Sequence, residues 1–249
     1  MSQSVTSTLL PLLRKLESWM LLDDEDRDAV LRLPSSVRVI EPHQHVVWEG
    51  EKSTHSCVLL SGYAYRHKVA GNGGRQILSL HMRGDVVDLQ NSLLGVADHN
   101  VQALTRLEAA FIPVEAIRAV VRSHPQVGMA MWYETLVDGS IFREWTLNVG
   151  RRDARTRLAH LLCEFAVRLK AAGLGEQNEY ILPMTQEQLA DSTGLTAVHV
   201  NRSLKGLEAD GLIKRTNRSV KIDDWQRLAR AGDFHSGYLH LPDDQHQAI

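Results

Sequence analysis

The spacing of apolar positions changes along the chain, and each period predicts a different kind of element. Between residues 37 and 112, short runs rich in β-branched and aromatic residues are separated by Gly, Asn, Asp and Ser, which is typical of β-strands. The predicted strands cover residues 37–40, 45–48, 56–60, 63–69, 76–81, 86–89, 101–104 and 107–112. Many short strands at regular spacing indicate an antiparallel barrel or jelly roll.

Helical spacing occurs on both sides of the strands. One helix is predicted over residues 23–33, and further helices over residues 114–123, 125–149 and 153–171. The helix from residue 125 has a heavy apolar load, which comprises Met129, Trp132, Leu136, Ile141 and Trp145. A helix that only linked two domains would not expose so many apolar side chains. We therefore expect it to pack on the barrel, on a second copy of the chain, or on both, and we favour self-association.

These elements predict an α+β chain in four parts. Residues 1–123 form an N-terminal β-barrel domain with flanking helices, residues 124–150 a dimerisation helix, and residues 151–233 a C-terminal domain. Residues 234–249 form a tail rich in His, Gly and Asp, which we expect to be partly disordered. A length of 249 residues suffices for two domains, each with its own core.

The most informative segment covers residues 184–213, where two short amphipathic helices flank a tight turn. Thr185 can cap the first helix, and Gln188 three residues later completes a capping box. Gly194 in the turn is free to adopt the positive φ that a sharp reversal needs. Thr196 can then cap the second helix. This layout is typical of a helix-turn-helix DNA-binding motif.

The second helix of this motif carries two stripes. Its inner stripe recurs at the spacing of a buried helical face and consists of Val200, Leu204 and Leu207. Its outer stripe stays available to a partner and consists of Val198, Asn201, Arg202 and Lys205. Arginine can bond bidentately to guanine, asparagine to adenine, and valine can contact a thymine methyl group. The outer stripe therefore suits the major groove of DNA.

Two short alternating runs, residues 212–214 and 219–222, follow the second helix and enclose a polar turn. They predict a β-hairpin with a basic tip, which is the wing of a winged helix. Arg215 and Arg218 would lie at that tip, where they can contact phosphate and add affinity without sequence information.

The composition of the chain restricts its expected partners and cellular compartment. The formal net charge is −2, so overall basicity does not indicate a nucleic-acid partner, but cations confined to a reading head still create a local positive field. Cys57 and Cys163 lie far apart in apolar surroundings and are expected to be buried thiols in a reducing compartment. No membrane-spanning run and no signal-peptide pattern occurs, so we expect a cytoplasmic protein without a membrane partner.

The sequence lacks the common catalytic motifs. It contains no G-x-S-x-G, Walker, H-E-x-x-H or dinucleotide-binding pattern. Residues 71–74, Gly-Asn-Gly-Gly, lie between two predicted strands and are better explained as a hairpin turn than as a phosphate loop. We therefore expect a protein that is not an enzyme.

A β-barrel, a long helix and a C-terminal winged helix-turn-helix, in that order, resemble the family of the cyclic AMP receptor protein and the fumarate-nitrate reduction regulator. The resemblance covers nearly the whole chain and is most specific in residues 62–64 (Gly-Tyr-Ala), 84–87 (Gly-Asp-Val-Val) and 194–204. It implies a transcriptional regulator with a cyclic-nucleotide-binding-like barrel and a homodimer built on the long helix. The paired recognition helices would read palindromic double-stranded DNA. Activation would add RNA polymerase as a partner.

The resemblance implies roles for residues of the recognition helix. Arg202 matches the arginine that family members direct at a guanine, and Asn201 sits where some members place a DNA-facing serine or glycine. Many members have a base-reading glutamate at the position of Val198 and a second arginine at that of Ala197. Both polar readers are missing here, so the resemblance implies an operator that differs from the best-known family consensus.

The first helix of the motif adds backbone contacts to this set. Thr185 matches a residue whose hydroxyl contacts phosphate, and the neighbouring Gln186 is expected to do likewise. The complete set of candidate DNA-binding residues is Thr185, Gln186, Thr196, Ala197, Val198, His199, Asn201, Arg202, Lys205, Arg215 and Arg218.

The barrel segment departs from the family's cyclic-nucleotide binders. Those members use a G-E-L cassette whose carboxylate takes the ribose hydroxyl, and an R-S or R-T pair that grips the phosphate. Here Leu89 occupies the glutamate position and the later pair is His99-Asn100, so a buried phosphate would lack its arginine. We expect no cyclic AMP binding and disfavour Asp88 as a displaced substitute. The candidate effector-pocket residues are Asp85, Asp88, Leu89, Gln90, His99 and Asn100.

Other sensing chemistries are disfavoured, and no cofactor or metal is assigned. An iron–sulfur cluster is not expected because the N-terminal segment has no cysteine. His43 and His45, if both lay in one strand, would share a face and offer a metal or haem site, but such surface pairs are more often solvated. Cys163 as a redox switch is disfavoured because a thiol in a leucine-rich helix usually serves packing.

A second function class stays open at this point. In that alternative the chain is a small-molecule-sensing module, responsive to haem, redox state or an unknown effector, and its winged helix mediates protein contacts. The salt dependence of DNA affinity distinguishes DNA binding from this alternative. A DNA-binding protein loses affinity as salt rises, because its phosphate contacts release counterions.

Overall fold

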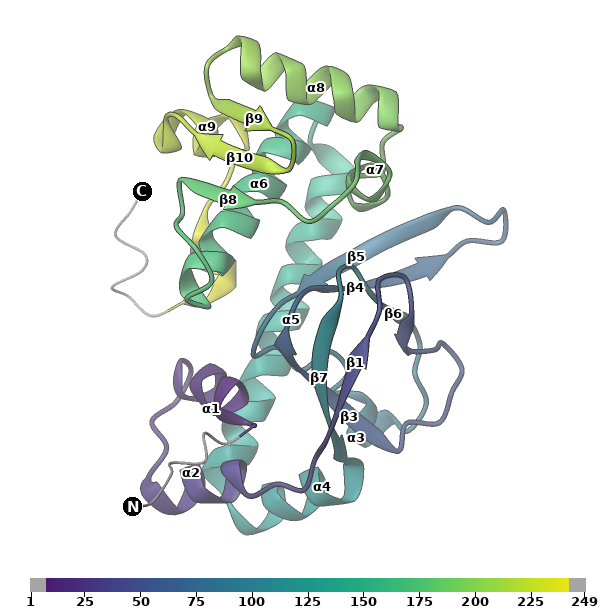
Figure 1. Ribbon diagram of the computed structural model, residues 1–249, viewed down its shortest axis with the longest axis vertical. Coiled ribbons are helices and arrows are strands. Elements are labelled where there is room, and N and C mark those ends of the chain that lie inside the picture. Colours follow the sequence, from purple (N-terminus) through teal and green to yellow (C-terminus); the bar gives the residue numbers. More distant parts are fainter. Residues whose placement is uncertain (1–7, 242–249) are drawn as a thin grey trace. The chain divides into compact units, whose positions relative to one another are not determined.

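The structure, a computed structural model, describes residues 8–241, and the chain divides into two compact units. Unit 1 contains the described residues up to 67 together with residues 80–138, and unit 2 contains residues 68–79 and the described chain from residue 139 onward. The division falls inside the long helix α5 (Pro125–Arg151), so each unit includes part of that helix (Figure 1).

The strands of the N-terminal half form two antiparallel sheets, as a jelly-roll-like domain requires (Figure 1). One sheet has the order β1-β7-β3 and the other the order β2-β6-β4-β5. Ala110 in the centre of β7 pairs with Val37 on one side and Val58 on the other, which sets the register of that sheet. The strands are β1 Ser36–Ile40, β2 His45–Val47, β3 His55–Ser61, β4 Ala64–Val69, β5 Arg75–His81, β6 Asn100–Ala103 and β7 Leu107–Pro113.

Alternate residues of β3 face two different cores, because successive side chains of a strand point to opposite sides of the sheet. Cys57 and Leu59 belong to the core between the two sheets. Val58 belongs to a second core that is completed by helices. Those helices are α1 (Leu10–Glu17), α2 (Asp24–Leu31), α4 (Val114–Ser123) and the first part of α5.

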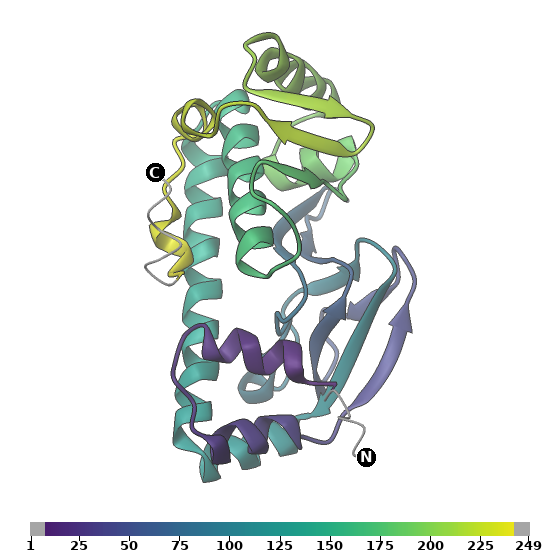
Figure 2. The ribbon, with the colours of Figure 1, turned by 60° about the vertical axis from the view of Figure 1, so that its left-hand side comes forward.

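Helix α1 also ties the turn after β5 to helix α5 through polar contacts; Figure 2 shows α1 crossing α5. The Lys15 ammonium donates to the Asp85 carboxylate at 2.9 Å. The Trp19 indole N–H donates to the Glu134 carboxylate on α5 at 2.7 Å. Burial raises the pKa of Glu134, and the Lys15 charge opposes that shift. Three separate segments of unit 1 are thereby joined by one small charge cluster.

Unit 2 is a winged helix built around helix α6 (Ala154–Ala171), against which α7, α8 and α9 pack. A three-stranded sheet of order β8-β10-β9 covers one end (Figures 1 and 2). None of the described helices combines the length and apolar character that crossing a bilayer requires. The remaining elements are β8 Glu179–Ile181, α7 Gln186–Thr193, α8 Ala197–Ala209, β9 Ile213–Thr216, β10 Ser219–Ile222, α9 Trp225–Ala231 and η1 Ser236–Leu239.

Most predicted elements are confirmed, but the predicted strand at residues 86–89 is wrong. Val86 makes only an isolated bridge to Val58, and the chain then turns into the short helix α3 (Asn91–Leu94). The physical reason is visible at Asp88, whose carboxylate accepts the Cys57 N–H at 2.8 Å and so replaces a neighbouring strand there.

The tail that was expected to be partly disordered is ordered over the part that the structure describes, residues 234–241. Phe234 and Leu239 are buried, and Ser236–Leu239 forms the short helix η1. The content of His, Gly and Asp suggested disorder, but the Phe234 ring packs edge-on against the His160 ring of α6. Residues 242–249 lie outside the described residues.

The packing of α8 gives a direct stability prediction. Leu204 is 1 % exposed, whereas the adjacent Lys205 is exposed. Leu204→Ala leaves a cavity and should lower the free energy of unfolding by about 2–5 kcal/mol. Lys205→Ala, the matched control, should change it by less than about 0.5 kcal/mol. Urea unfolding followed by circular dichroism measures both, and equal losses would contradict this packing.

Candidate nucleic-acid interface

The turn between α7 and α8 is held by the capping groups that the sequence predicted. The Thr185 hydroxyl accepts the Gln188 N–H at 3.2 Å, and the Gln188 amide oxygen accepts the Thr185 N–H at 2.8 Å, which closes the capping box. Gly194 has φ 63°, where a side chain would be strained. The Thr196 hydroxyl accepts the His199 N–H and caps α8. These contacts fix where the second helix begins.

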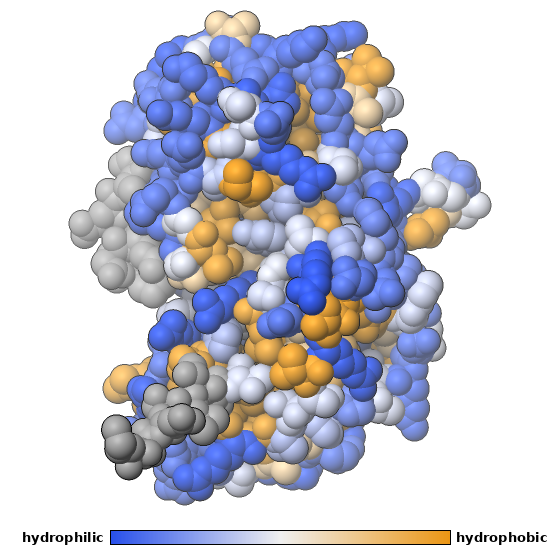
Figure 3. All heavy atoms as spheres, in the orientation of Figure 1, coloured by the Kyte–Doolittle hydropathy of each residue, from blue (hydrophilic) through white to orange (hydrophobic). Residues whose placement is uncertain are grey.

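Helix α8 presents its two stripes as predicted. Val200, Leu204 and Leu207 are at most 1 % exposed and pack inward. On the other side, Val198 is 69 % exposed, and hydrophilic side chains dominate the face of unit 2 over α8 and the wing in Figure 3. Arg202 and Lys205 are exposed, and Asn201 is half-buried. The inner stripe therefore holds the helix, and the outer stripe is left for a partner.

The cationic side chains of Arg202 and Lys205 are both exposed on α8, and the sequence favours Arg202 as the base reader. The guanidinium of Arg202 has no hydrogen-bond or ion-pair partner within residues 8–241, so it keeps its five donors for another molecule. His199 is exposed and Ala197 half-buried near the start of α8. Thr185 and Gln186, at the start of α7, are exposed as phosphate contacts require.

The wing is shorter at its tip than the sequence suggested. Strand β9 continues to Thr216, and the turn consists of Asn217, with φ 56°, and the exposed Arg218. Arg215 lies in the strand, where its guanidinium donates to the Glu208 carboxylate at 2.8 Å. That hydrogen bond lowers the pKa of Glu208. Arg218 is thus placed at the tip, whereas Arg215 already supports α8.

The apolar residues expected on the dimerisation helix lie on two faces of α5. Met129, Trp132 and Leu136 are 44 %, 58 % and 54 % exposed and follow the i, i+3, i+7 spacing of a helix–helix seam. Ile141 and Trp145 are each 6 % exposed, since five and nine residues beyond Leu136 a helix has turned to its opposite side. Their assignment to the dimer face is therefore corrected.

Trp145 instead contributes to the interior of unit 2. Its indole N–H donates to the Glu164 carboxylate at 2.9 Å, and that carboxyl group is buried. Leu147, 45 % exposed, is a further apolar side chain on the outer side of α5 that the sequence reasoning did not single out.

Four of the six candidate effector-pocket residues already have structural partners or positions in the fold. The Asp85 carboxylate is bound by Lys15 and by the Met82 N–H, and Leu89 is part of the helix-covered core. Gln90 is half-buried at the start of α3. The Asn100 side chain accepts the Glu49 N–H at 3.0 Å. These four serve turns and packing, which leaves Asp88 and His99 as the interior polar groups of the set.

A buried guanidinium that the sequence reasoning missed lies near those two groups. Arg66 on β4 is 2 % exposed and donates to the Asp138 carboxylate on α5 and to the Val87 carbonyl, both at 2.7 Å. Burial raises the pKa of Asp88 and lowers that of His99. The Arg66 charge opposes the first shift and adds to the second, so the three groups are close. The interior of unit 1 therefore already holds an ion pair. Its members are separated by 72 positions in sequence, so no local pattern joins them.

The other candidate sensing groups are placed differently from a ligand set. His43 has φ 69° and precedes strand β2, so it does not share a strand face with His45, which stacks on Trp48 at 3.4 Å between ring centroids. Burial raises the pKa of the Cys57 and Cys163 thiols, which keeps both in the unreactive protonated form. Among residues 8–241, no three His, Cys, Asp or Glu side chains gather as a metal site would require.

Comparisons with known proteins match both halves of the chain. The model of the cyclic nucleotide-binding domain matches residues 37–124, and that of the Crp-like helix-turn-helix domain matches residues 156–231. The transcriptional activator protein FnrL of Cereibacter sphaeroides is 31 % identical over 221 residues, which cover 87 % of this chain and 88 % of that protein. The nitrogen fixation regulation protein FixK of Azorhizobium caulinodans is 26 % identical over 174 residues, 70 % of this chain and 69 % of that one.

Among solved structures, FixK2 from Bradyrhizobium japonicum has a similar fold. The two superpose with a TM-score of 0.73 at 22 % identity, over 80 % of this chain and 98 % of that chain. The fold of barrel, long helix and winged helix is therefore shared along most of the length of both proteins.

The buried Asp88 carboxyl predicts a pH-dependent stability. Burial raises its pKa to about 6, although hydrogen bonds from the Cys57 N–H and the Ser56 hydroxyl oppose the shift. The folded chain holds this proton more tightly than the unfolded chain, so ionised Asp88 destabilises the fold above about pH 6, and that cost disappears as the pH falls toward 4. Asp88→Asn keeps an acceptor and should raise stability at pH 8 by an amount on the order of 1–3 kcal/mol.

Urea unfolding of wild type and Asp88→Asn at pH 8 and pH 5 measures this effect. The gain at pH 8 should shrink strongly at pH 5. Asp28→Asn, which removes an exposed carboxylate of α2 paired with Arg32, is the matched control and should show no such difference. An equal gain for Asp88→Asn at both pH values would contradict a raised pKa.

Proposed function

Since the chain belongs to the CRP/FNR family of DNA-binding transcriptional regulators, we propose that it reads palindromic double-stranded DNA as a homodimer, with one α8 in each half-site. The observation that carries this proposal is the exposed outer stripe of α8, with its unpaired Arg202 among the described residues. Guanidinium and carboxamide groups on one helical edge fit the acceptor and donor pattern of base pairs in the major groove.

The exposed stripe of α5 supports the homodimer. Met129, Trp132 and Leu136 form an apolar strip that a monomer would leave in water. A parallel pairing of two α5 helices would bury this strip by knobs-into-holes packing. The two-fold axis of such a dimer makes the operator a palindrome, with half-sites about 34 Å apart, one turn of DNA.

The proposed regulator works without cyclic AMP. Leu89 stands in the core where a carboxylate would be needed, and the buried Arg66 is already neutralised by Asp138. A cyclic phosphate would have to break that ion pair and lose its interaction energy. The effector, if one is used, is therefore of another class, and no enzymatic activity is part of the proposal.

The names of the relatives support a role at promoters. FnrL is a transcriptional activator and FixK a nitrogen fixation regulation protein. By analogy, RNA polymerase is a further proposed partner of this chain when it is bound to its operator.

Arg202→Ala tests the base-reading role. Loss of the bidentate contact should reduce discrimination at one symmetric base pair by roughly 1–3 kcal/mol in each half-site. Fluorescence anisotropy on the operator and on duplexes changed at single base pairs measures this. Arg32→Ala, which removes an exposed cation of α2, is the control and should leave all affinity ratios unchanged.

Two outcomes would contradict the proposed DNA-binding function. If Arg202→Ala kept the wild-type ratio between operator and altered duplexes, Arg202 would not read a base. If the wild-type affinity for DNA did not depend on salt, phosphate contacts would be absent. The alternative, in which the winged helix binds protein, would then be favoured.

A second prediction concerns cyclic AMP. Its addition should produce no saturable heat in calorimetry and no change in operator affinity, because Leu89 occupies the position of the ribose-binding carboxylate and Arg66 is paired with Asp138. A cyclic AMP receptor protein measured in parallel is the positive control. Saturable binding, or an operator affinity that rises with cyclic AMP, would contradict the proposal.

A further inference from the structure

Residues 232–241 follow helix α9 and lie beyond the stretch that matches the Crp-like helix-turn-helix domain, which ends at residue 231. We call them the C-terminal strap. In Figure 2 the strap runs back along α5 and α6 within unit 2. The strap lies outside the family match, yet specific contacts hold it in place and bury part of it.

The first attachment of the strap is at Asp233. Its carboxylate accepts from the Arg152 guanidinium at 3.0 and 3.1 Å, and its carbonyl accepts a further bond at 3.1 Å. Arg152 stands at the elbow between α5, which ends at Arg151, and Asp153, which caps α6. The side chain of Arg152 is 8 % exposed and also pairs with Glu144 on α5 at 2.7 Å.

The second attachment is at Tyr238. Its hydroxyl donates to the Glu164 carboxylate at 2.8 Å and lies 3.0 Å from the His160 ring nitrogen Nε2. Burial lowers the pKa of His160 to about 4, and the Arg152 charge adds to that shift, so the imidazole is neutral near pH 7. Nδ1 of this neutral ring donates to the carbonyl of Gly232 at 3.1 Å, which ties the ring to the first residue of the strap. The same Glu164 accepts the Trp145 N–H from α5.

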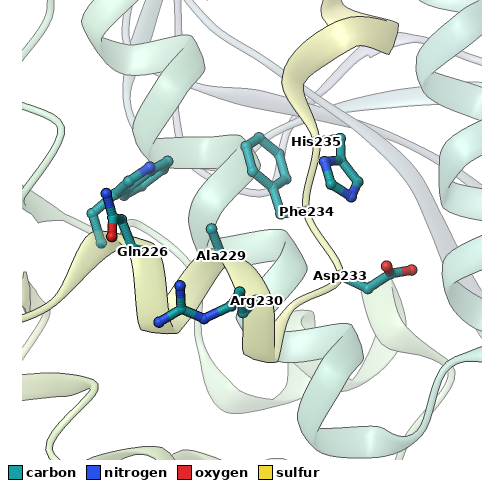
Figure 4. Close-up of a pocket in the computed structure, with 7 residues that line it drawn as sticks. Gln226, Ala229, Arg230, Asp233, Phe234 and His235 are labelled. Atoms are coloured by element: carbon teal, nitrogen blue, oxygen red, sulfur yellow. The ribbon is translucent and has the colours of Figure 1, made fainter. Parts of the chain in front are cut away.

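Close packing seats the strap between these two attachments. Phe234 is 3 % exposed and meets the His160 ring edge-on at 5.2 Å. A side-chain carbon at Gly232 would come within 2.7 Å of the His160 backbone, so only glycine permits this approach. On its outer side the strap and α9 enclose an open cleft of about 390 Å³, lined by Ala229, Arg230, Phe234 and His235 among others (Figure 4).

Through these contacts the strap connects three helices of unit 2, namely α9, α6 and α5. The strap continues from α9 of the winged helix, holds α6 through His160 and Glu164, and reaches α5 through Arg152 and Glu144. We infer that the C-terminal strap is a positioning element for DNA recognition. It fixes the angle of the α5–α6 elbow and so sets the half-site spacing that the dimer accepts. This inference rests on the proposed function.

The link to spacing follows from the geometry of a dimer. Two recognition helices fixed to paired α5 helices reach half-sites at only one separation and one rotation about the DNA axis. One added base pair moves a half-site by about 3.4 Å and turns it by about 35°. A rigid elbow cannot follow that movement, whereas a loosened elbow can.

The test compares operators that differ only in spacing. The half-sites obtained for the wild-type protein are joined with the preferred spacer and with spacers one base pair longer and shorter. Asp233→Asn and Tyr238→Phe, singly and together, are measured on each duplex with the full-length chain. Asparagine tolerates the φ of 46° at position 233, and phenylalanine keeps the ring, so both variants preserve the packing. Asp28→Asn is the control, because its ion pair is exposed on α2.

In the double variant, the ratio of affinities for preferred and altered spacers should fall at least about fivefold, the factor expected when about 1 kcal/mol of elbow stiffness is lost. The control should keep the wild-type ratio. An unchanged ratio in the double variant would overturn the inference. Equal weakening on all spacers, or loss of all binding, would also overturn it, since either outcome indicates a merely structural role. If the wild-type protein bound no duplex, the proposed function would fail first.

Discussion

Three side chains of α8, Val200, Leu204 and Leu207, are withdrawn from water against the core of unit 2, and the rest of the account depends on this burial. Burying such side chains stabilises each position by about 1.5–3 kcal/mol, so the three together outweigh the roughly 1 kcal/mol that an N-cap contributes. The burial fixes the rotation of the helix about its axis. Because that rotation is fixed, Asn201 and Arg202 lie on the outer edge of the helix. Core packing thus sets the direction of the edge that we propose reads DNA.

In the barrel, a buried ion pair rather than apolar packing fixes the position of a functional group. Its interior holds Arg66, whose charge is met by Asp138 from α5. A buried cation demands such a partner, because an unpaired charge in a low dielectric is too costly to keep. The ion pair therefore joins the sheet to the long helix within unit 1. Because the Arg66 guanidinium is paired with the Asp138 carboxylate, it is not free to bind the phosphate of a ligand.

Sequence reasoning succeeded where local rules decide the structure. Thr185, Gln188, Gly194 and Thr196 act through neighbours three or four residues away, so the helix-turn-helix could be predicted in detail. It failed where distant residues decide. The Arg66–Asp138 pair left no local trace, and Ile141 and Trp145 looked like seam residues until the phase of the helix was known.

The strap shows why composition alone misleads. The His, Gly and Asp content of residues 234–249 suggested partial disorder, yet Phe234 and Tyr238 contact His160 on α6 and Leu239 is buried. A few aromatic side chains at the right places outweigh the polar average, because each buries as much surface as several small residues. No periodicity test detects so short a segment.

Selection of bound sequences from a random duplex pool by the wild-type protein tests the central claim most directly. The account predicts enrichment of a two-fold symmetric sequence with half-site centres about one helical turn apart, in which an invariant guanine in each half matches the arginine of the outer stripe. Enrichment of an asymmetric sequence, or no enrichment at any salt concentration, would contradict it.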